Sequence, residues 1–391
     1  MSSSLFIEIG AFQQQKHGED CFGDTIYSKK IPEEQRVVSI LSDGLGSGVK
    51  ANILSSMTTR MAMKFVESNM ELLRSSEVMM DALPVCQVRK ISYATFSIVD
   101  SELEGKTRIF EMDNPPFMFI RDGKPLNIKS RELSSPKWKD RTINISQVMT
   151  QPEDRIILIS DGVSQAGLGN RLYPLGWQRQ GCLDFALKEI RKNPYISAHE
   201  LAEKIVRAAL DKEVDKQAGD DISCVVIYFR KPRKLLVLTG PPFDEDKDHE
   251  FAELVACYDG KTVICGGTTA NIVERELCLT CEIDKTSFDE KIPMSSTMDG
   301  IDLVTEGILT LTEVYRMLKE GIDKDKNNAA VRLANLLLDS DRIDFVVGTK
   351  INIAHQDPSL PMELEIRRNI VKKIFRILQD KYLKEISVRY M

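Results

Sequence analysis

Two apolar runs in the first half of this 391-residue chain stop at the same dipeptide, Asp-Gly. The runs are RVVSILSDG (36–44) and RIILISDG (155–162). A short apolar run that ends in a turn signal is typical of a buried β-strand. A third run, ISCVVIYF (222–229), directly follows the acidic pair Asp220 and Asp221. We therefore expect buried strands that carry carboxylates at their ends.

Further strands and helices are expected between these runs. Residues 91–128 are rich in β-branched and aromatic residues and are broken by turn dipeptides, which predicts a meander of antiparallel strands. Residues 197–214 predict a helix with Ser197 as its N-cap. Residues 48–68 predict an amphipathic helix, whose apolar face would consist of Leu54, Met57, Met61 and Phe65.

The chain is long enough for two domains, and its pattern changes after the basic segment 229–234. Strands then alternate with helix-like stretches, which predicts a small α/β domain; these stretches are 235–242, 261–277 and 301–321, followed by an amphipathic helix over 364–383. We therefore expect one domain over residues 1–231 and a second over residues 235–391.

Composition excludes several classes of function. The formal net charge of -6 argues against a nucleic-acid partner, because a phosphate backbone requires a concentrated basic surface. The N-terminus lacks the pattern of a signal peptide, and no window approaches the roughly 18 apolar residues of a membrane span. We therefore expect a cytoplasmic protein without a membrane partner. Cys278 and Cys281 form a C-x-x-C pair, which leaves either a zinc or redox site or ordinary reduced cysteines.

Four aspartates share one context, next to an end of an apolar strand: Asp20, Asp43, Asp161 and Asp220. Any single Asp-Gly pair is equally well explained as a turn. The chain has only four histidines, and hard cations such as Mg²⁺ and Mn²⁺ prefer carboxylate oxygens. Two such ions sharing a carboxylate can activate a water for attack on a phosphate ester. A cluster of these aspartates would therefore favour phosphate-ester hydrolysis.

The acidic motifs, in their order along the chain, resemble those of the metal-dependent protein phosphatases of type 2C. The likeness is to the bacterial branch typified by the stage II sporulation protein E phosphatase domain, and it covers roughly residues 5 to 230. The matching motifs are Glu19-Asp20, LSDGLGSG (41–48), ISDG (159–162) and AGDDIS (218–223). The resemblance implies an α+β fold, specifically an α-β-β-α sandwich in which two antiparallel sheets lie between helical layers and carry the metals at one end.

The resemblance also implies roles for individual residues. Asp43 would bridge two Mn²⁺ or Mg²⁺ ions, and the carbonyl of Gly44 would help to hold one of them. Asp161 and Asp220 would hold the second ion, and Asp221 would either hydrogen-bond to a metal-bound group or hold a third ion. These residues would together activate the attacking water.

The sequence leaves three further assignments open at the first two motifs. Asp20 is the expected ligand of the first ion, but Asp24 competes for that role because it lies only four residues later. Many eukaryotic members have an arginine before the Glu-Asp pair, where this chain offers Lys16 as a catalytic substitute. Those members also have a histidine where this chain has Leu45, so the general acid is unassigned.

The leading hypothesis is an active phosphatase for a phosphoserine or phosphothreonine protein. The resemblance suggests an anti-sigma-factor antagonist as that partner. Two alternatives stay open: a catalytically weak or inactive scaffold with the phosphatase fold, and a ligand-sensing protein that acts through residues 235–391. In the second domain, CGGTTAN (265–271) would suit either a phosphate or nucleotide ligand or a structural turn. Homodimer formation is also left open.

Overall fold

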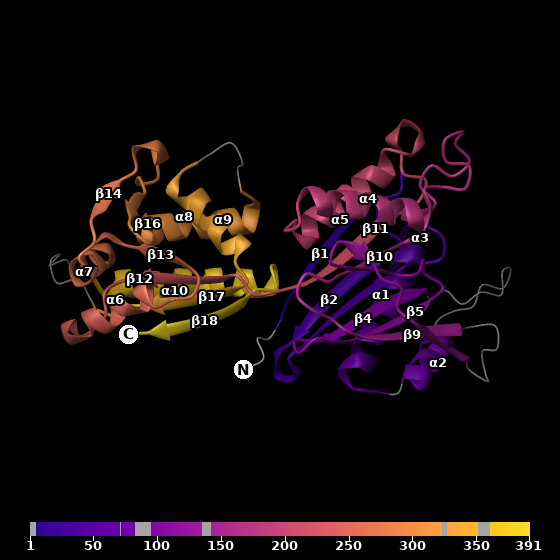
Figure 1. Cartoon of the computed structure of the whole chain (residues 1–391), viewed down its shortest axis with the longest axis horizontal. Coiled ribbons are helices and arrows are strands. Elements are labelled where there is room, and N and C mark those ends of the chain that lie inside the picture. Colours follow the sequence, from indigo (N-terminus) through magenta and orange to yellow (C-terminus); the bar gives the residue numbers. More distant parts are fainter. Residues whose placement is uncertain (1–4, 71, 83–94, 135–141, 323–326, 351–359) are drawn as a thin grey trace. The chain divides into compact units, whose positions relative to one another are not determined.

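The computed structural model describes residues 5–70, 72–82, 95–134, 142–322, 327–350 and 360–391. The chain divides into two compact units, Met1–Lys231 and Pro232–Met391. Figure 1 shows the first unit in indigo to magenta and the second in orange to yellow. No helix of the described part of the chain is long and apolar enough to cross a membrane.

Unit 1 contains two antiparallel sheets. The first has the strand order β1-β11-β10-β6-β7, and the second has the order β2-β3-β4-β5-β9-β8. The first sheet consists of β1 (Phe6–Gln14), β6 (Met118–Arg121), β7 (Lys124–Pro125), β10 (Arg155–Ile159) and β11 (Ile222–Arg230). The second consists of β2 (Thr25–Ile31), β3 (Arg36–Ser42), β4 (Phe96–Glu102), β5 (Lys106–Met112), β8 (Ser130–Ser134) and β9 (Thr142–Met149).

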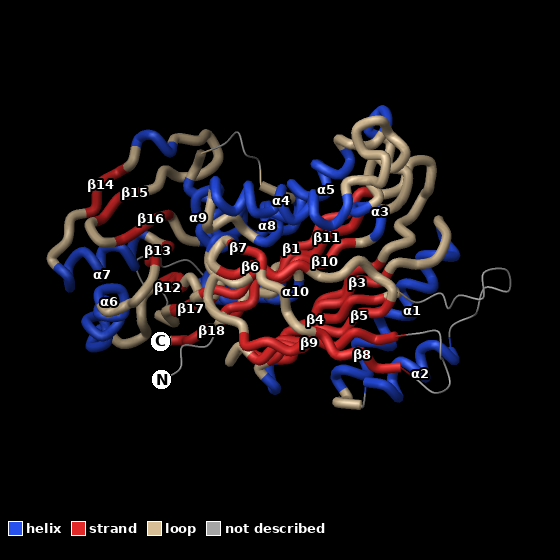
Figure 2. The backbone as a smooth tube through the Cα atoms, turned by 45° about the vertical axis from the view of Figure 1, so that its right-hand side comes forward, coloured by secondary structure: helices blue, strands red, loops and turns tan. Residues whose placement is uncertain are grey.

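The sheets face each other across a shared core, and helices cover their outer faces (Figure 2). Helices α1 (Gly48–Glu67) and α2 (Leu72–Ala82) pack on the second sheet. Helices α3 (Asp161–Ser164), α4 (Gln178–Lys192) and α5 (Ala198–Leu210) pack on the first sheet. The predicted α+β fold with two antiparallel sheets is therefore confirmed, and the order of its layers is α-β-β-α.

Strand β11 shows why the sequence signals were continuous apolar runs. Successive side chains of a strand point to opposite faces of the sheet. Val225, Ile227 and Phe229 enter the core between the sheets, whereas Val226 and Tyr228 pack under the helices. Because both faces are covered, every position along this central strand is apolar or otherwise buried.

Two local predictions were wrong in detail. Met57 was expected on the apolar face of α1 but is 43% exposed, because α1 packs through a neighbouring face that includes the small residues Ala51 and Ala62. Residues 95–128 do not form one meander, because β6 leaves the sheet of β4 and β5 and pairs with β10. Pro115 and Pro116 lie at that crossing, where they cannot donate to a strand ladder. Residues 91–94 lie outside the described residues.

Unit 2 is built on one mixed sheet with the order β14-β15-β16-β13-β12-β17-β18. The five strands from β16 to β18 run parallel, and β14 and β15 extend the sheet antiparallel. The bounds are β12 (Lys234–Thr239), β13 (Lys261–Cys265), β14 (Cys281–Ile283), β15 (Ser296–Met298), β16 (Ile301–Thr305), β17 (Arg342–Val347) and β18 (Glu385–Tyr390).

Helices cover both faces of this sheet. Helices α6 (Asp248–Ala256) and α7 (Gly267–Leu277) pack on one face. Helices α8 (Ile308–Glu320), α9 (Ala329–Asp339) and α10 (Leu360–Asp380) pack on the other. Of the apolar residues at four-residue spacing along α10, Ile370, Ile374 and Leu378 are buried, whereas Ile366 is 44% exposed near the start of the helix.

A buried carboxyl in unit 1 makes its stability depend on pH. Burial raises the pKa of Glu111 from 4.5 to about 7, although the Phe117 N–H donates to it and Arg179 lies nearby. The folded state therefore favours the protonated form. Unit 1 should lose up to about 3 kcal/mol of stability as pH rises from 4.5 to 7, with no further loss from this group above pH 7.

Glu111→Gln should remove this dependence, because glutamine is neutral at every pH and retains an oxygen that can accept from Phe117 N–H. Urea unfolding from pH 5 to pH 8 would show a flatter stability profile for the variant than for the parent. The same change at the exposed Glu104 serves as a control and should leave the profile unchanged. Parallel profiles for the parent and Glu111→Gln would contradict the prediction.

Candidate active site

The register of the strands brings the acidic motifs to one end of both sheets. Ser42 at the end of β3 pairs with Thr25 at the start of β2, so the residues on either side of these strands are neighbours. In the other sheet, Gln14 at the end of β1 pairs with Ile222 at the start of β11. Strand β10 ends beside the same part of β11. Asp43 and Asp161 follow the ends of β3 and β10, and Asp220 precedes the start of β11. All three therefore lie at the same end of the two sheets.

Asp43 interacts with the other carboxylates at this end of the two sheets. The pKa of the Asp43 carboxyl is raised to about 10, and burial is the main cause. Repulsion by Asp24 and Asp161 is the next largest cause. Asp220 adds further repulsion. The pKa of Asp220 is raised too, by burial first and then by Asp161. The structure thus brings together four carboxylates, from Asp24, Asp43, Asp161 and Asp220.

Asp24 occupies a buried position in this group. It is only 4% exposed, and the Ser223 hydroxyl donates to its Oδ2 at 2.6 Å. Burial raises the pKa of Asp24 to about 7, against the lowering effect of hydrogen bonds from Ser223 and Ser160. Asp24 thus connects the loop after β1 with β11 and with the start of α3.

Asp20 lies elsewhere, on an exposed turn of the same loop. No hydrogen bond or ion pair among the described residues joins it to the four carboxylates. The neighbouring Glu19 instead accepts a hydrogen bond from the Ser47 hydroxyl at 2.6 Å, at the start of α1. The sequence held a signal for Asp24, because it directly precedes the strand that begins at Thr25, whereas Asp20 is separated from that strand by a turn.

Asp221 and Lys16 hold the loop against β11. Asp221 is buried, and its two carboxylate oxygens accept the N–H of Lys16 at 2.9 Å and the N–H of Gly23 at 2.5 Å. Because both oxygens accept backbone hydrogen bonds, Asp221 positions the loop that carries Asp24. The Lys16 ammonium lies 3.8 Å from Asp220 Oδ1 and is partly exposed.

Two glycines allow the backbone at this edge to pack closely. A Cβ on Gly44 would lie 2.1 Å from the Ala51 carbonyl oxygen on α1. A Cβ on Gly162 would lie 2.1 Å from the Asp221 carbonyl oxygen. A side chain at either position would push apart the segments that carry the aspartates. The Gly of each Asp-Gly pair therefore has a packing role in addition to its role in a turn.

The chemistry of these donors fits a divalent cation. Carboxylate oxygens are the ligands that Mg²⁺ and Mn²⁺ take, and a bound cation would relieve the repulsion that raises the pKa of Asp43. Within the described residues, however, no group of three or more His, Cys, Asp or Glu side chains is arranged to hold one metal ion. The carboxylates interact electrostatically, but their side chains do not converge on a single point in this structure.

Comparison with known proteins gives the family. The model of the stage II sporulation protein E (SpoIIE) family matches residues 33–230, which is more than half of the chain. The chain therefore belongs to this family, and it contains a phosphatase domain of the SpoIIE, PP2C type. The match includes Asp43, Asp161 and Asp220 and begins after the loop of Asp24. The resemblance found in the sequence is confirmed.

The solved structures to which the chain is similar include the following three. The SpoIIE phosphatase domain from Bacillus subtilis is 17% identical, with 59% of this chain and 95% of that chain covered and a TM-score of 0.43. The RsbU and RsbW domains of Rv1364c from Mycobacterium tuberculosis are 14% identical, with 65% and 68% covered and a TM-score of 0.47. The catalytic domain of the serine/threonine phosphatase PstP, in complex with two manganese ions, is 14% identical, with 58% and 100% covered and a TM-score of 0.39. No curated protein matches the chain.

Proposed function

We propose that this protein is a metal-dependent phosphatase that hydrolyses phosphoserine or phosphothreonine in a protein substrate. The observation that carries the proposal is the convergence of Asp24, Asp43, Asp161 and Asp220 at one edge of a phosphatase-family domain. Two Mn²⁺ or Mg²⁺ ions bound there would supply a nucleophilic water and neutralise charge on the phosphoryl group.

The roles of the side chains follow from their places in the cluster. Asp43 interacts with all three other carboxylates, so it is suited to bridge two ions. We assign the first ion to Asp24 in place of Asp20, with the Gly44 carbonyl beside it. The second ion would be held by Asp161 and Asp220. Asp221 keeps the loop in place through its two backbone hydrogen bonds.

The basic test is hydrolysis of p-nitrophenyl phosphate by the purified full chain. Activity should be absent with EDTA and restored by Mn²⁺ or Mg²⁺. A folded protein without activity in either metal would contradict the proposal and favour the alternative of a non-catalytic scaffold.

Lys16 is proposed to contact the phosphate of the substrate. Its ammonium lies beside Asp220 and its side chain is 31% exposed, so it can reach a group bound at the cluster. Lys16→Met should raise KM by about tenfold and leave kcat nearly unchanged, since a point charge would be lost from substrate binding. Steady-state kinetics with a phosphoserine peptide would measure this. Lys188→Met on the exposed side of α4 is the matched control and should have no effect.

We also propose a class of protein substrate and a general role for unit 2. By resemblance to the bacterial branch, the substrate would be a phosphorylated regulator of the anti-sigma-factor antagonist class. The second unit, Pro232–Met391, would sense a ligand or a partner and adjust the phosphatase. Assays of candidate phosphoproteins should then show a higher kcat/KM than p-nitrophenyl phosphate.

A further inference from the structure

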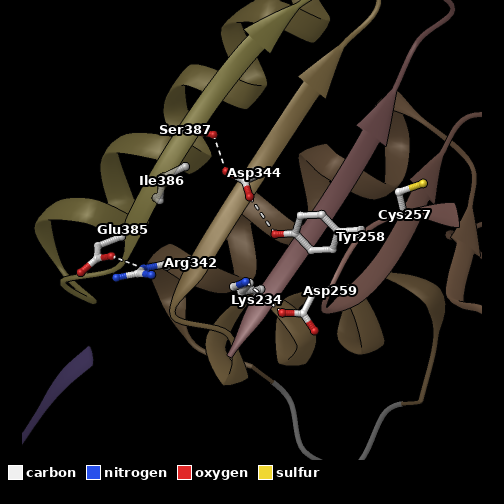
Figure 3. A pocket seen from close by; sticks show the side chains of 9 residues that line it. All are labelled: Lys234, Cys257, Tyr258, Asp259, Arg342, Asp344, Glu385, Ile386 and Ser387. Atoms are coloured by element: carbon white, nitrogen blue, oxygen red, sulfur yellow. Dashed lines mark hydrogen bonds and ion pairs between the residues drawn. The ribbon is translucent and has the colours of Figure 1, made fainter. Parts of the chain in front are cut away.

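Two regions of unit 2 offer polar groups to a ligand. They lie at opposite ends of the parallel strands. A pocket of about 400 Å³ lies at the edge where β12, β17 and β18 begin (Figure 3). Its charged groups are already paired: Lys234 with Asp259, Arg342 with Glu385, and Asp344 with the Tyr258 and Ser387 hydroxyls. A ligand there would have to displace these interactions.

The glycine-rich turn between β13 and α7 lies at the other end of the sheet, where the parallel strands end. Open α/β sheets bind ligands outside the carboxyl ends of their strands. Gly266 takes a φ of 125°, which glycine adopts readily, and α7 then begins at Gly267. Gly267 and Thr268 are exposed, and no neighbouring atom lies within 4 Å of the position that a Cβ would take on Gly267. The start of α7 is thus open to solvent.

The first amides of α7 have no acceptor among the described residues. Gly266, the N-cap, has no side chain that could cap the helix, and its own N–H donates to the Thr305 carbonyl. The neighbouring helix α8 differs, because the Glu306 carboxylate accepts from the N–H groups of Leu309 and Thr310. The N–H groups and the dipole at an uncapped helix start favour an anion.

A buried hydroxyl at the same turn also lacks a partner. Thr269 is 0% exposed, and its Oγ1 makes no hydrogen bond in the structure. This oxygen faces the turn, since it is the nearest atom, at 3.2 Å, to the position that a Cβ would take on Gly266. A buried hydroxyl without a partner is costly, so its retention at an uncapped helix start points to a ligand.

We propose that the Gly266 turn and the first turn of α7 bind a phosphate group, either free or carried by a nucleotide. The N–H groups of Gly267, Thr268 and Thr269 would donate to the phosphate oxygens, and the Thr269 hydroxyl would add a further donor. The glycines at 266 and 267 let the ligand approach the backbone. This site goes beyond the phosphatase function and does not depend on it.

The test is calorimetric titration of the full chain with inorganic phosphate, AMP and ADP in the presence of EDTA, which keeps divalent cations from the aspartate cluster. Thr269→Val removes the hydroxyl without leaving a cavity and should weaken binding roughly tenfold or more. Thr268→Asp would place a carboxylate at the helix start and should abolish binding. The matched control is Thr310→Val, because Thr310 Oγ1 is also buried without a partner but its helix is already capped by Glu306.

The outcomes separate the proposal from a structural role for Thr269. Equal affinities of the parent chain for phosphate and the nucleotides, each weakened roughly tenfold or more in Thr269→Val, would identify free phosphate as the ligand. Tighter binding of AMP or ADP would identify a nucleotide. Absence of binding in the parent chain at millimolar ligand, or equal affinities for the parent and Thr269→Val, would overturn the proposal. Thermal unfolding of each variant without ligand checks its fold, and Thr269→Val alone should not lower the unfolding temperature.

Discussion

Asp24→Asn is expected to lower the phosphatase turnover by on the order of 100-fold, whereas Asp20→Asn should change it by less than about threefold. The two residues lie four positions apart in the chain, but only Asp24 is buried among the other carboxylates. Loss of its charge would remove a ligand of the first ion, and charge stabilisation by a bound metal is worth several kcal/mol. Asp20 is exposed and has no such contact.

The comparison requires that both variants fold. Asparagine at position 24 retains an oxygen that can accept from Ser223, so Asp24→Asn should unfold near the temperature of the parent. Turnover would be measured with p-nitrophenyl phosphate over a range of Mn²⁺ concentrations, which also reveals a weakened metal affinity. A larger loss in Asp20→Asn than in Asp24→Asn would mean that the loop rearranges when metal binds and that our assignment is wrong.

Gly10→Ala should destabilise unit 1 by at least about 3 kcal/mol, which corresponds to a fall of roughly 10 °C in its unfolding temperature. Gly10 lies in the middle of β1, where α5 crosses the strand. A Cβ at this position would lie 2.0 Å from the His199 backbone nitrogen and 2.1 Å from the Ala198 carbonyl carbon. These are backbone atoms, so relief requires that the whole helix move.

Gly219→Ala is the matched control for this prediction. Its added Cβ would meet no atom closer than the Glu213 Oε2, at 3.6 Å, and a change in stability of less than about 1 kcal/mol is expected. Calorimetry of the full chain would measure both variants, with the transition of unit 1 assigned by its sensitivity to Glu111→Gln. Equal unfolding temperatures for Gly10→Ala and the parent would show that α5 is not held against β1 as closely as described.

The sequence was most informative where one physical requirement dominates. Strands β3, β10 and β11 are buried at every position, so their sequences are mostly apolar, and such runs are easy to detect. The Asp-Gly pairs after β3 and β10 then mark the edge where the carboxylates gather. The family motifs added the order of the layers, which periodicity alone does not give.

Other features depend on contacts between distant parts of the chain. The burial of Asp24 relies on Ser223, which is 199 residues away, and no local pattern encodes that pairing. The crossing of β6 to the other sheet follows from its pairing with β10, although the two prolines before it mark the break. Met57 is exposed because α1 packs through a face that includes small residues. The spacing of apolar residues alone does not show which face of a helix packs on the sheet.

We propose that these carboxylates form a metal-dependent phosphatase centre. The most direct test is hydrolysis of a phosphoserine peptide by the full chain in EDTA, Mg²⁺ or Mn²⁺, compared with Asp43→Asn and Asp161→Asn. We expect activity only with a divalent cation in the parent and a loss on the order of 100-fold or more in both variants. Activity that persists in EDTA, or that survives in both folded variants, would show that these carboxylates do not form a metal-dependent phosphatase centre.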